Sequence, residues 1–227
     1  MNRNELIQAI QRKVADEPNI SEEKLDDTVE EALARYSQER PRTIAVDVPG
    51  TGAFEYNLPT GFVDDFSSML SVQYPFDPTD QNPPYVKAGD DFQLYRGTVG
   101  LVLRFAESRP ASGELFRATY TAPHTVTVSS TTVPQGDERA VINLGAALLC
   151  EMLAAEYERR SRSTLPEATF DLRTKSQEYQ TQADRYYKLW RDQMGISDDG
   201  RPQAAVAWTD TDWTLSDLAP PLTHPIQ

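Results

Sequence analysis

One stretch of the chain, residues 140–157, is apolar on almost every side. Between Ala140 and Ala155, only Asn143 and Glu151 interrupt the run of apolar and small residues. A helix that is apolar over most of its girth packs against other elements on several faces. A helix that spans a membrane needs about 20 apolar residues, and this run is shorter and carries Glu151 near its middle. The pattern therefore predicts a buried core helix that the rest of the chain covers.

Two amphipathic helices are predicted before residue 41. Asn2 and Glu5 have the spacing of a capping box, and apolar residues follow on one face. Ser21, followed by two glutamates, predicts the start of a second helix, which Pro41 closes. The expected buried positions of the two helices are Leu6, Ile10, Val14, Leu25, Val29, Ala32, Leu33 and Tyr36.

Beyond the core helix, a final helix is predicted over roughly residues 172–194. Gly195 ends it, after a break at residues 163–166. Its wide apolar and aromatic face contains Tyr179, Ala183, Tyr186, Tyr187 and Trp190. An aromatic stripe at helical spacing indicates core packing rather than a cofactor site.

From residue 43 the period changes to the alternation of β-strands. Residues 43–48 and 53–58 alternate on either side of a Pro-Gly turn, which predicts that these two strands pair. Further strand-like segments, separated by turn residues, are 68–74, 85–87, 92–95, 101–105 and 115–120. Residues 124–128 are either a last strand or an extended approach to the core helix, for which Asp137 is the candidate N-cap. Several short strands with turns between them predict an antiparallel sheet or a small sandwich.

The fold class expected from these elements is α+β. We expect a helical bundle built around the central apolar helix, with an inserted antiparallel β subdomain and an extended C-terminal arm. A chain of 227 residues is long enough for one core with such an insertion. The expected parts are the N-terminal helices (1–41), the β subdomain (42–133), the core and last helices (134–195) and the arm (196–227).

The last thirty residues have no clear period and too little apolar material for a core of their own. A disordered terminus is one interpretation of them. They nevertheless contain two tryptophans, a residue type that often anchors interfaces. We therefore favour an extended arm that docks on a neighbouring subunit or a partner, with contact residues Trp208, Trp213, Leu215 and Leu218.

The net charge of −13 disfavours binding to nucleic acid by charge neutralisation, and also adhesion to anionic membranes. The first residues lack the apolar core of a signal peptide, so we expect a chain made in a cytosol. The single cysteine, Cys150, lies in the core helix and is expected to be an apolar filler. With it and only His124 and His224, no ordinary zinc site can be assembled.

Sequence motifs of catalysis are missing. The chain contains no Walker loop, no dinucleotide-binding glycine pattern and no nucleophile elbow. The acidic pairs at 64–65 and 90–91 lie in predicted turns, where solubility is their simplest role and a magnesium site the alternative. Residues 198–200 fall short of a calcium loop. We expect no enzyme activity, no cofactor and no metal.

Several segments resemble the head-to-tail adaptor (connector) proteins of tailed bacteriophages. Those proteins often have an Ala-Ile/Leu-x-x-Tyr-Ser run, followed by a strand pair and a Tyr-x-Leu-Pro segment. In this chain the first motif is Ala32 to Ser37 and the second is Tyr56 to Pro59. Residues 148–157, followed by 175–179 and the Tyr-Trp cluster at 186–190, are similar to the late helices of those proteins. The resemblance covers roughly residues 20–194, with a larger β part than in the minimal all-helical adaptors.

The resemblance implies a structural virion protein that forms a ring, commonly of twelve copies, beneath the portal. Such a ring extends the DNA channel, lets DNA pass without specific binding, and docks the next neck, stopper or tail protein. The implied location is the virion neck, after synthesis in the host bacterial cytoplasm, with no membrane partner. On the residues alone, an acidic channel lining offers the DNA backbone no strong attachment.

Two other classes stay open. One is a non-enzymatic module that binds a carbohydrate or a peptide on the β subdomain, where Tyr85, Phe92 and Tyr95 are candidate contacts, although strand alternation places some of them in the core. The other is a glycosidase with carboxylates alone, for which the sequence indicates no specific pair of acids.

Overall fold

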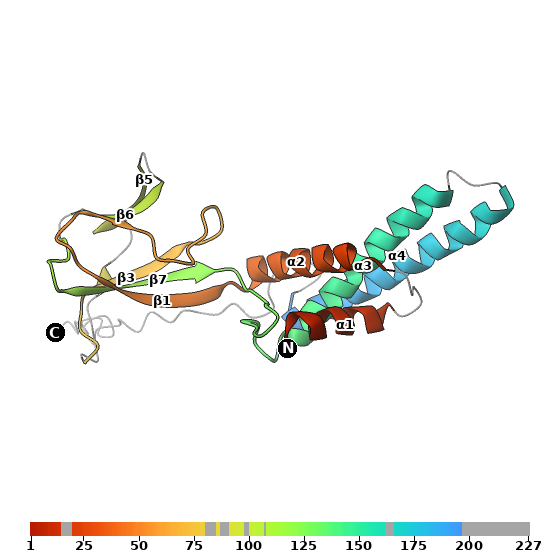
Figure 1. The fold of residues 1–227 in the computed structure, drawn as a ribbon, viewed down its shortest axis with the longest axis horizontal. Helices are drawn as coiled ribbons and strands as arrows, with labels where there is room; N and C mark the ends of the chain where they lie inside the picture. The colour runs from red at the N-terminus through yellow and green to blue at the C-terminus, as the bar shows by residue number, and fades with distance from the viewer. Residues whose placement is uncertain are drawn as a thin grey trace, which may run out of the picture.

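The computed structural model describes residues 1–14, 20–79, 85–86, 91–97, 100–106, 108–161 and 166–196. Figure 1 shows an elongated molecule with two parts placed end to end, here called the helical lobe and the β lobe. The helical lobe contains α1 (Arg3–Lys13), α2 (Glu22–Glu39), α3 (Glu138–Ser161) and α4 (Pro166–Met194). The β lobe contains the strands between α2 and α3. The fold is α+β, as expected.

The two N-terminal helices begin as the sequence predicts. Asn2 and Glu5 form the complete capping box at the start of α1. The Ser21 side chain accepts the Lys24 N–H group at the start of α2. The predicted apolar stripes of both helices are buried in the helical core. Local sequence therefore determines where these helices begin and which face they bury.

Helix α3 is the centre of the helical lobe, in contact with α1, α2 and α4. By length and composition alone it could cross a membrane, but 72% of its most apolar window is buried inside the protein, as in a core helix. Gly145 lets α1 approach closely, because a Cβ atom there would lie 2.5 Å from Ile10 Cδ1. The prediction of a buried core helix is confirmed.

The two polar residues that interrupt the apolar run of α3 both contact α4. Asn143 Nδ2 donates to Gln193 Oε1 at 3.0 Å. Glu151 Oε2 accepts the Tyr187 hydroxyl at 2.9 Å, and Arg35 of α2 donates to the same hydroxyl oxygen. Burying a polar group is tolerated only where it is hydrogen-bonded, so these pairs set how α4 lies against α3.

Helix α4 begins at Pro166, several residues before the predicted start. Proline is acceptable in a first helical turn, because its missing N–H group would have no partner there. The predicted end is confirmed: Gly195 has φ +68°, and the Ile196 N–H group donates to the Arg191 carbonyl at 2.9 Å. This is the Schellman arrangement, in which a left-handed residue reverses the chain.

The β lobe consists of two antiparallel sheets. The larger has the order β1-β7-β3-β4, formed by Arg42–Pro49, Leu115–Ala122, Met69–Phe76 and Tyr85–Val86. The smaller has the order β2-β6-β5, formed by Glu55–Asn57, Leu101–Phe105 and Phe92–Arg96. Tyr56, Phe105 and Phe116 meet edge to face between the sheets, with ring centroids 4.9–5.7 Å apart. The small sandwich is one of the two predicted arrangements.

The predicted pairing of the first two strands is wrong. β1 pairs with β7, with Val46 opposite Ala118, whereas β2 pairs with β6 in the other sheet. The Pro-Gly turn between them binds a distant loop instead: the Gly50 N–H group donates to the Glu114 carbonyl at 2.7 Å. A Cβ atom on Gly50 would lie 2.4 Å from the Ala111 carbonyl oxygen, so this contact requires glycine.

The segment after β7 belongs to the helical lobe. Residues 124–132 form a turn closed by an isolated bridge between Val126 and Thr131. Val126 and Val133 pack in the helical core, and the Thr127 carbonyl accepts the Arg3 N–H group at 3.0 Å. Of the two interpretations of residues 124–128, the approach to the core helix is the one observed.

Candidate interaction surfaces

The predicted contact residues of the arm, Trp208, Trp213, Leu215 and Leu218, lie outside the described residues. The same holds for His224 and for residues 198–200. The arm therefore stays a prediction.

Among the described residues, no three His, Cys, Asp or Glu side chains come together in a way that could hold a metal ion. The Cys150 thiol is fully buried, and burial raises its pKa to about 12. A thiol with so high a pKa carries almost no thiolate at neutral pH and is a poor nucleophile. This agrees with the expected role of Cys150 as an apolar filler.

The acidic pair at residues 64–65 has a local role. Asp64 Oδ2 lies 3.7 Å from the Arg96 guanidinium at the end of β5. Asp65 adopts φ +67° in the turn before β3, a conformation that aspartate tolerates better than most residues. Asp64 thus has a cationic partner, and Asp65 occupies a position that its backbone conformation suits. Asp90 of the second pair lies outside the described residues.

The aromatic residues considered for a binding module do not form one site. Phe92 is 3% exposed and lies in the β core, whereas Tyr95 is 49% exposed on the same strand. Tyr85 belongs to the other sheet. Of Phe92 and Tyr95, only Tyr95, beside Arg104, is available to a ligand.

The end of α2, the start of α3 and the end of α4 meet beside the chain segments that lead into and out of the β lobe. The Tyr36 hydroxyl donates to Asp137 Oδ2 at 2.7 Å, and Arg40 donates to both carboxylate oxygens at 2.9 Å. Arg40 also donates to the Met194 carbonyl at 3.1 Å. Burial and the neighbouring Asp137 carboxylate raise the pKa of the Tyr36 hydroxyl. This junction ties the end of α2 to the start of α3 and the end of α4.

His124 carries the chain from β7 into the same junction. The backbone N–H group of His124 donates to Ser37 Oγ at 2.9 Å, and the centroid of its ring lies 5.0 Å from the centroid of the Tyr36 ring. His124 Nδ1 is 2.8 Å from the Thr132 carbonyl oxygen, so Nδ1 bears a hydrogen. Burial lowers the pKa of the imidazole. The folded protein therefore favours the neutral ring.

This lowered pKa predicts a loss of stability in mild acid. As the pH falls below about 6.5, the unfolded chain binds a proton at His124 more readily than the folded chain does, so the free energy of unfolding decreases. We expect His124→Asn to be less sensitive than the wild type to a change from about pH 7 to about pH 5.5. Urea unfolding of both proteins over this range measures the difference. Equal sensitivities would show that His124 does not titrate differently on folding.

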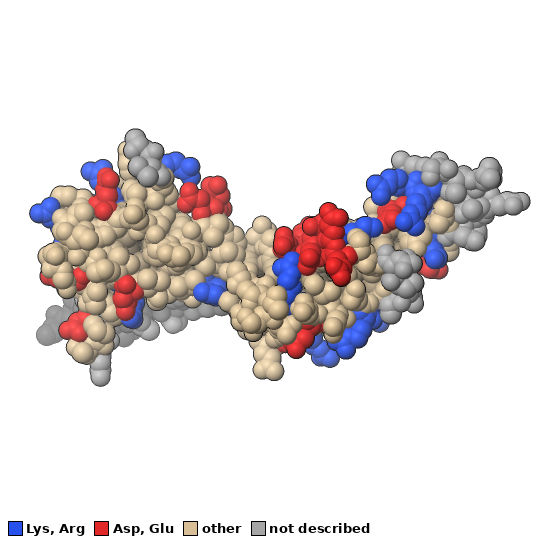
Figure 2. Space-filling model, in the orientation of Figure 1, with Lys and Arg blue, Asp and Glu red and all other residues tan. Residues whose placement is uncertain are grey.

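A ridge of acidic side chains runs along α2 (Figure 2), here called the acidic ridge. It consists of Glu22, Glu23, Asp26, Asp27, Glu30 and Glu31. Arg3 pairs with Asp26 and Glu30, and Arg35 pairs with Glu31. Within the described part of the chain, Glu22, Glu23 and Asp27 have no ion-pair partner. The ridge is thus only partly neutralised, and it repels polyanions.

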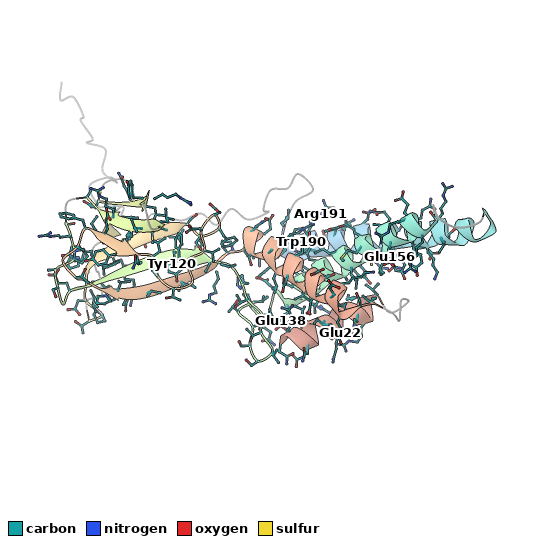
Figure 3. All side chains as sticks on the ribbon, turned by 45° about the horizontal axis from the view of Figure 1, so that its top comes forward. Glu22, Tyr120, Glu138, Glu156, Trp190 and Arg191 are labelled. Carbon is teal, nitrogen blue, oxygen red and sulfur yellow. The ribbon has the colours of Figure 1, made fainter. Side chains whose placement is uncertain are left out.

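An ion pair between Lys24 and Glu156 links α2 to α3. Glu156, marked in Figure 3, accepts hydrogen bonds from Lys24 of α2 and from Arg160 one turn later. The hydrogen bond from Lys24 is the main reason that the pKa of Glu156 is lowered. This contact holds α2, and with it the acidic ridge, at a defined angle to the core helix.

No protein-family model matches the chain, and no curated protein matches it.

Proposed function

We propose that this chain is a structural head-to-tail adaptor of a tailed bacteriophage, which forms a ring beneath the portal and docks the next neck or tail component. The observation that carries the proposal is the place of the residues on which the resemblance rests. Tyr36 and Ser37 lie in the last turn of α2, at the junction, and Tyr56 packs in the core of the β lobe. Tyr157 and Tyr179 stack between α3 and α4, with centroids 5.6 Å apart. The matched residues are thus buried residues that hold together the helices of the helical lobe and the two sheets of the β lobe.

The shape and charge of the molecule support the same function. A subunit with a helical lobe at one end and a β lobe at the other can contact different partners above and below a ring (Figure 1). In the proposed ring, the acidic ridge of α2 lines the channel, where it repels the phosphate backbone and lets DNA slide. The arm after Ile196 is the proposed contact with the portal.

The proposal is tested by native mass spectrometry and negative-stain imaging of the full chain, with and without the portal protein of the same phage. We expect closed rings, either alone or only on the portal, because a heterologous interface that closes produces a ring. A chain that remains monomeric at all concentrations and ignores the portal would contradict the adaptor function. A screen of glycans and peptides on the β lobe would then test the alternative.

The channel role has its own matched variants. Changing the unpaired Glu22, Glu23 and Asp27 to lysine should make assembled rings retain duplex DNA at low salt and release it at higher salt. The control carries the same change of charge at the exposed Glu178, Asp184 and Asp192 of α4. Retention that is equal in both variants, measured by gel shift over a salt series, would show that the ridge does not face the DNA.

A further inference from the structure

A groove of about 520 Å³ opens between the end of α1, the start of α3 and the end of α4. Its rim carries the exposed cations Arg12, Lys13 and Arg139, none of which forms an ion pair with a described residue. Its floor includes Ile142 and Leu189, and Leu189 is 36% exposed. The groove therefore combines an apolar floor with unneutralised positive charge at its edge.

These features specify the chemistry of the occupant. The apolar floor suits a large, flat apolar group, and the cationic rim suits acidic neighbours. The tryptophan side chain is such a group. Residues 208–213 of this chain read Trp-Thr-Asp-Thr-Asp-Trp, with two acids between two tryptophans. This segment offers each group that the groove requires.

The same segment is tethered close to the groove. Gln193 lies in the groove wall, and eleven residues separate Ile196, at the end of α4, from Trp208. Eleven residues can span roughly 20 Å on average, and a short tether gives an effective concentration in the millimolar range. Docking within one chain is therefore favoured over docking between chains.

We propose that residues 208–213 dock in the groove between α1, α3 and α4 of their own chain. A tryptophan lies on Ile142 and Leu189, and Asp210 and Asp212 meet the cations of the rim. This docking does not depend on the adaptor function. If the chain is an adaptor, the arm leaves the groove when it binds the portal, so the free subunit keeps its tryptophans covered until assembly.

Cysteine pairs in the full chain test the docking. Leu189→Cys together with Thr211→Cys should form an intrachain disulfide under mild oxidation at least about tenfold faster than the control pair Val128→Cys with Thr211→Cys. Val128 is 68% exposed in the turn near the start of α1, and the native Cys150 is buried and does not compete. Non-reducing gels and mass spectrometry of the cross-linked peptides measure both rates.

The charge of the rim provides a second readout. Arg12→Glu with Arg139→Glu, placed in the Leu189→Cys and Thr211→Cys chain, should slow the cross-link about tenfold without unfolding the protein, as checked by circular dichroism. Equal rates for the two cysteine pairs, or no effect of the reversed charges, would overturn the proposal. So would disulfides of the Leu189→Cys and Thr211→Cys chain that form only between chains and run as dimers on the non-reducing gel. Ring formation is measured separately, so failure of the adaptor function and failure of the docking are distinguishable.

Discussion

Replacing Leu149 with alanine should lower the free energy of unfolding by about 2–5 kcal/mol. Leu149 has no exposed surface and lies in the middle of α3, which the other three helices surround. The substitution removes buried apolar atoms and leaves a cavity that close-packed neighbours fill only in part. Urea unfolding followed by circular dichroism measures the loss.

Two controls separate the cavity from a general effect of substitution. Leu149→Met keeps the volume and should cost less than about 1.5 kcal/mol. Val128→Ala, at a position that is 68% exposed, should change stability by less than about 0.5 kcal/mol. A loss below about 1 kcal/mol for Leu149→Ala would contradict the central position of α3 in the core.

Replacing Asp137 with alanine should cost about 2–4 kcal/mol, the second large effect that we expect. The change removes the acceptor of the Tyr36 hydroxyl and both contacts from Arg40. Tyr36 is fully buried, so its hydroxyl would keep no partner in place of the carboxylate. An unsatisfied buried donor costs more than the hydrogen bond itself contributes.

A double-mutant cycle with Tyr36→Phe isolates this contact. Once Tyr36 has lost its hydroxyl, Asp137→Ala should cost less than it does alone, by about 1 kcal/mol or more. Glu39→Ala, an exposed acid in the last turn of α2, serves as the control and should be nearly neutral. Strictly additive losses would show that the hydroxyl and the carboxylate do not stabilise one another.

The helical lobe could be predicted well from the sequence because its signals are local. Caps such as Asn2 and Ser21 lie within three residues of the groups that they bind, and helical periodicity marks the buried face. The β lobe could not be predicted to the same extent. The alternation of residues 43–48 indicates a strand, but the same inner face can pair with any strand of matching pattern, and the chain uses β7 rather than β2.

Candidate sites, like strand pairs, could be predicted from the sequence only where the signal is local. The sequence excluded a zinc site of ordinary type and identified Cys150 as a filler, because both conclusions follow from residue type and periodicity. It did not indicate the groove, because Lys13, Asn143 and Leu189 are far apart in the chain and come together only when three helices pack. No pattern within one helix marks such a site.

The sequence by itself determined which segments are helices, where most of them begin and end, and that residues 140–157 form the centre of the helical core. Only the tertiary structure decided the strand partners, the use of Asp137 as the acceptor that ties the end of α2 to the start of α3, and the groove beside α4. The physical reason is range: caps and periodicity act within one or two turns, whereas pairing, burial and ion pairs depend on residues that the chain brings together from far apart.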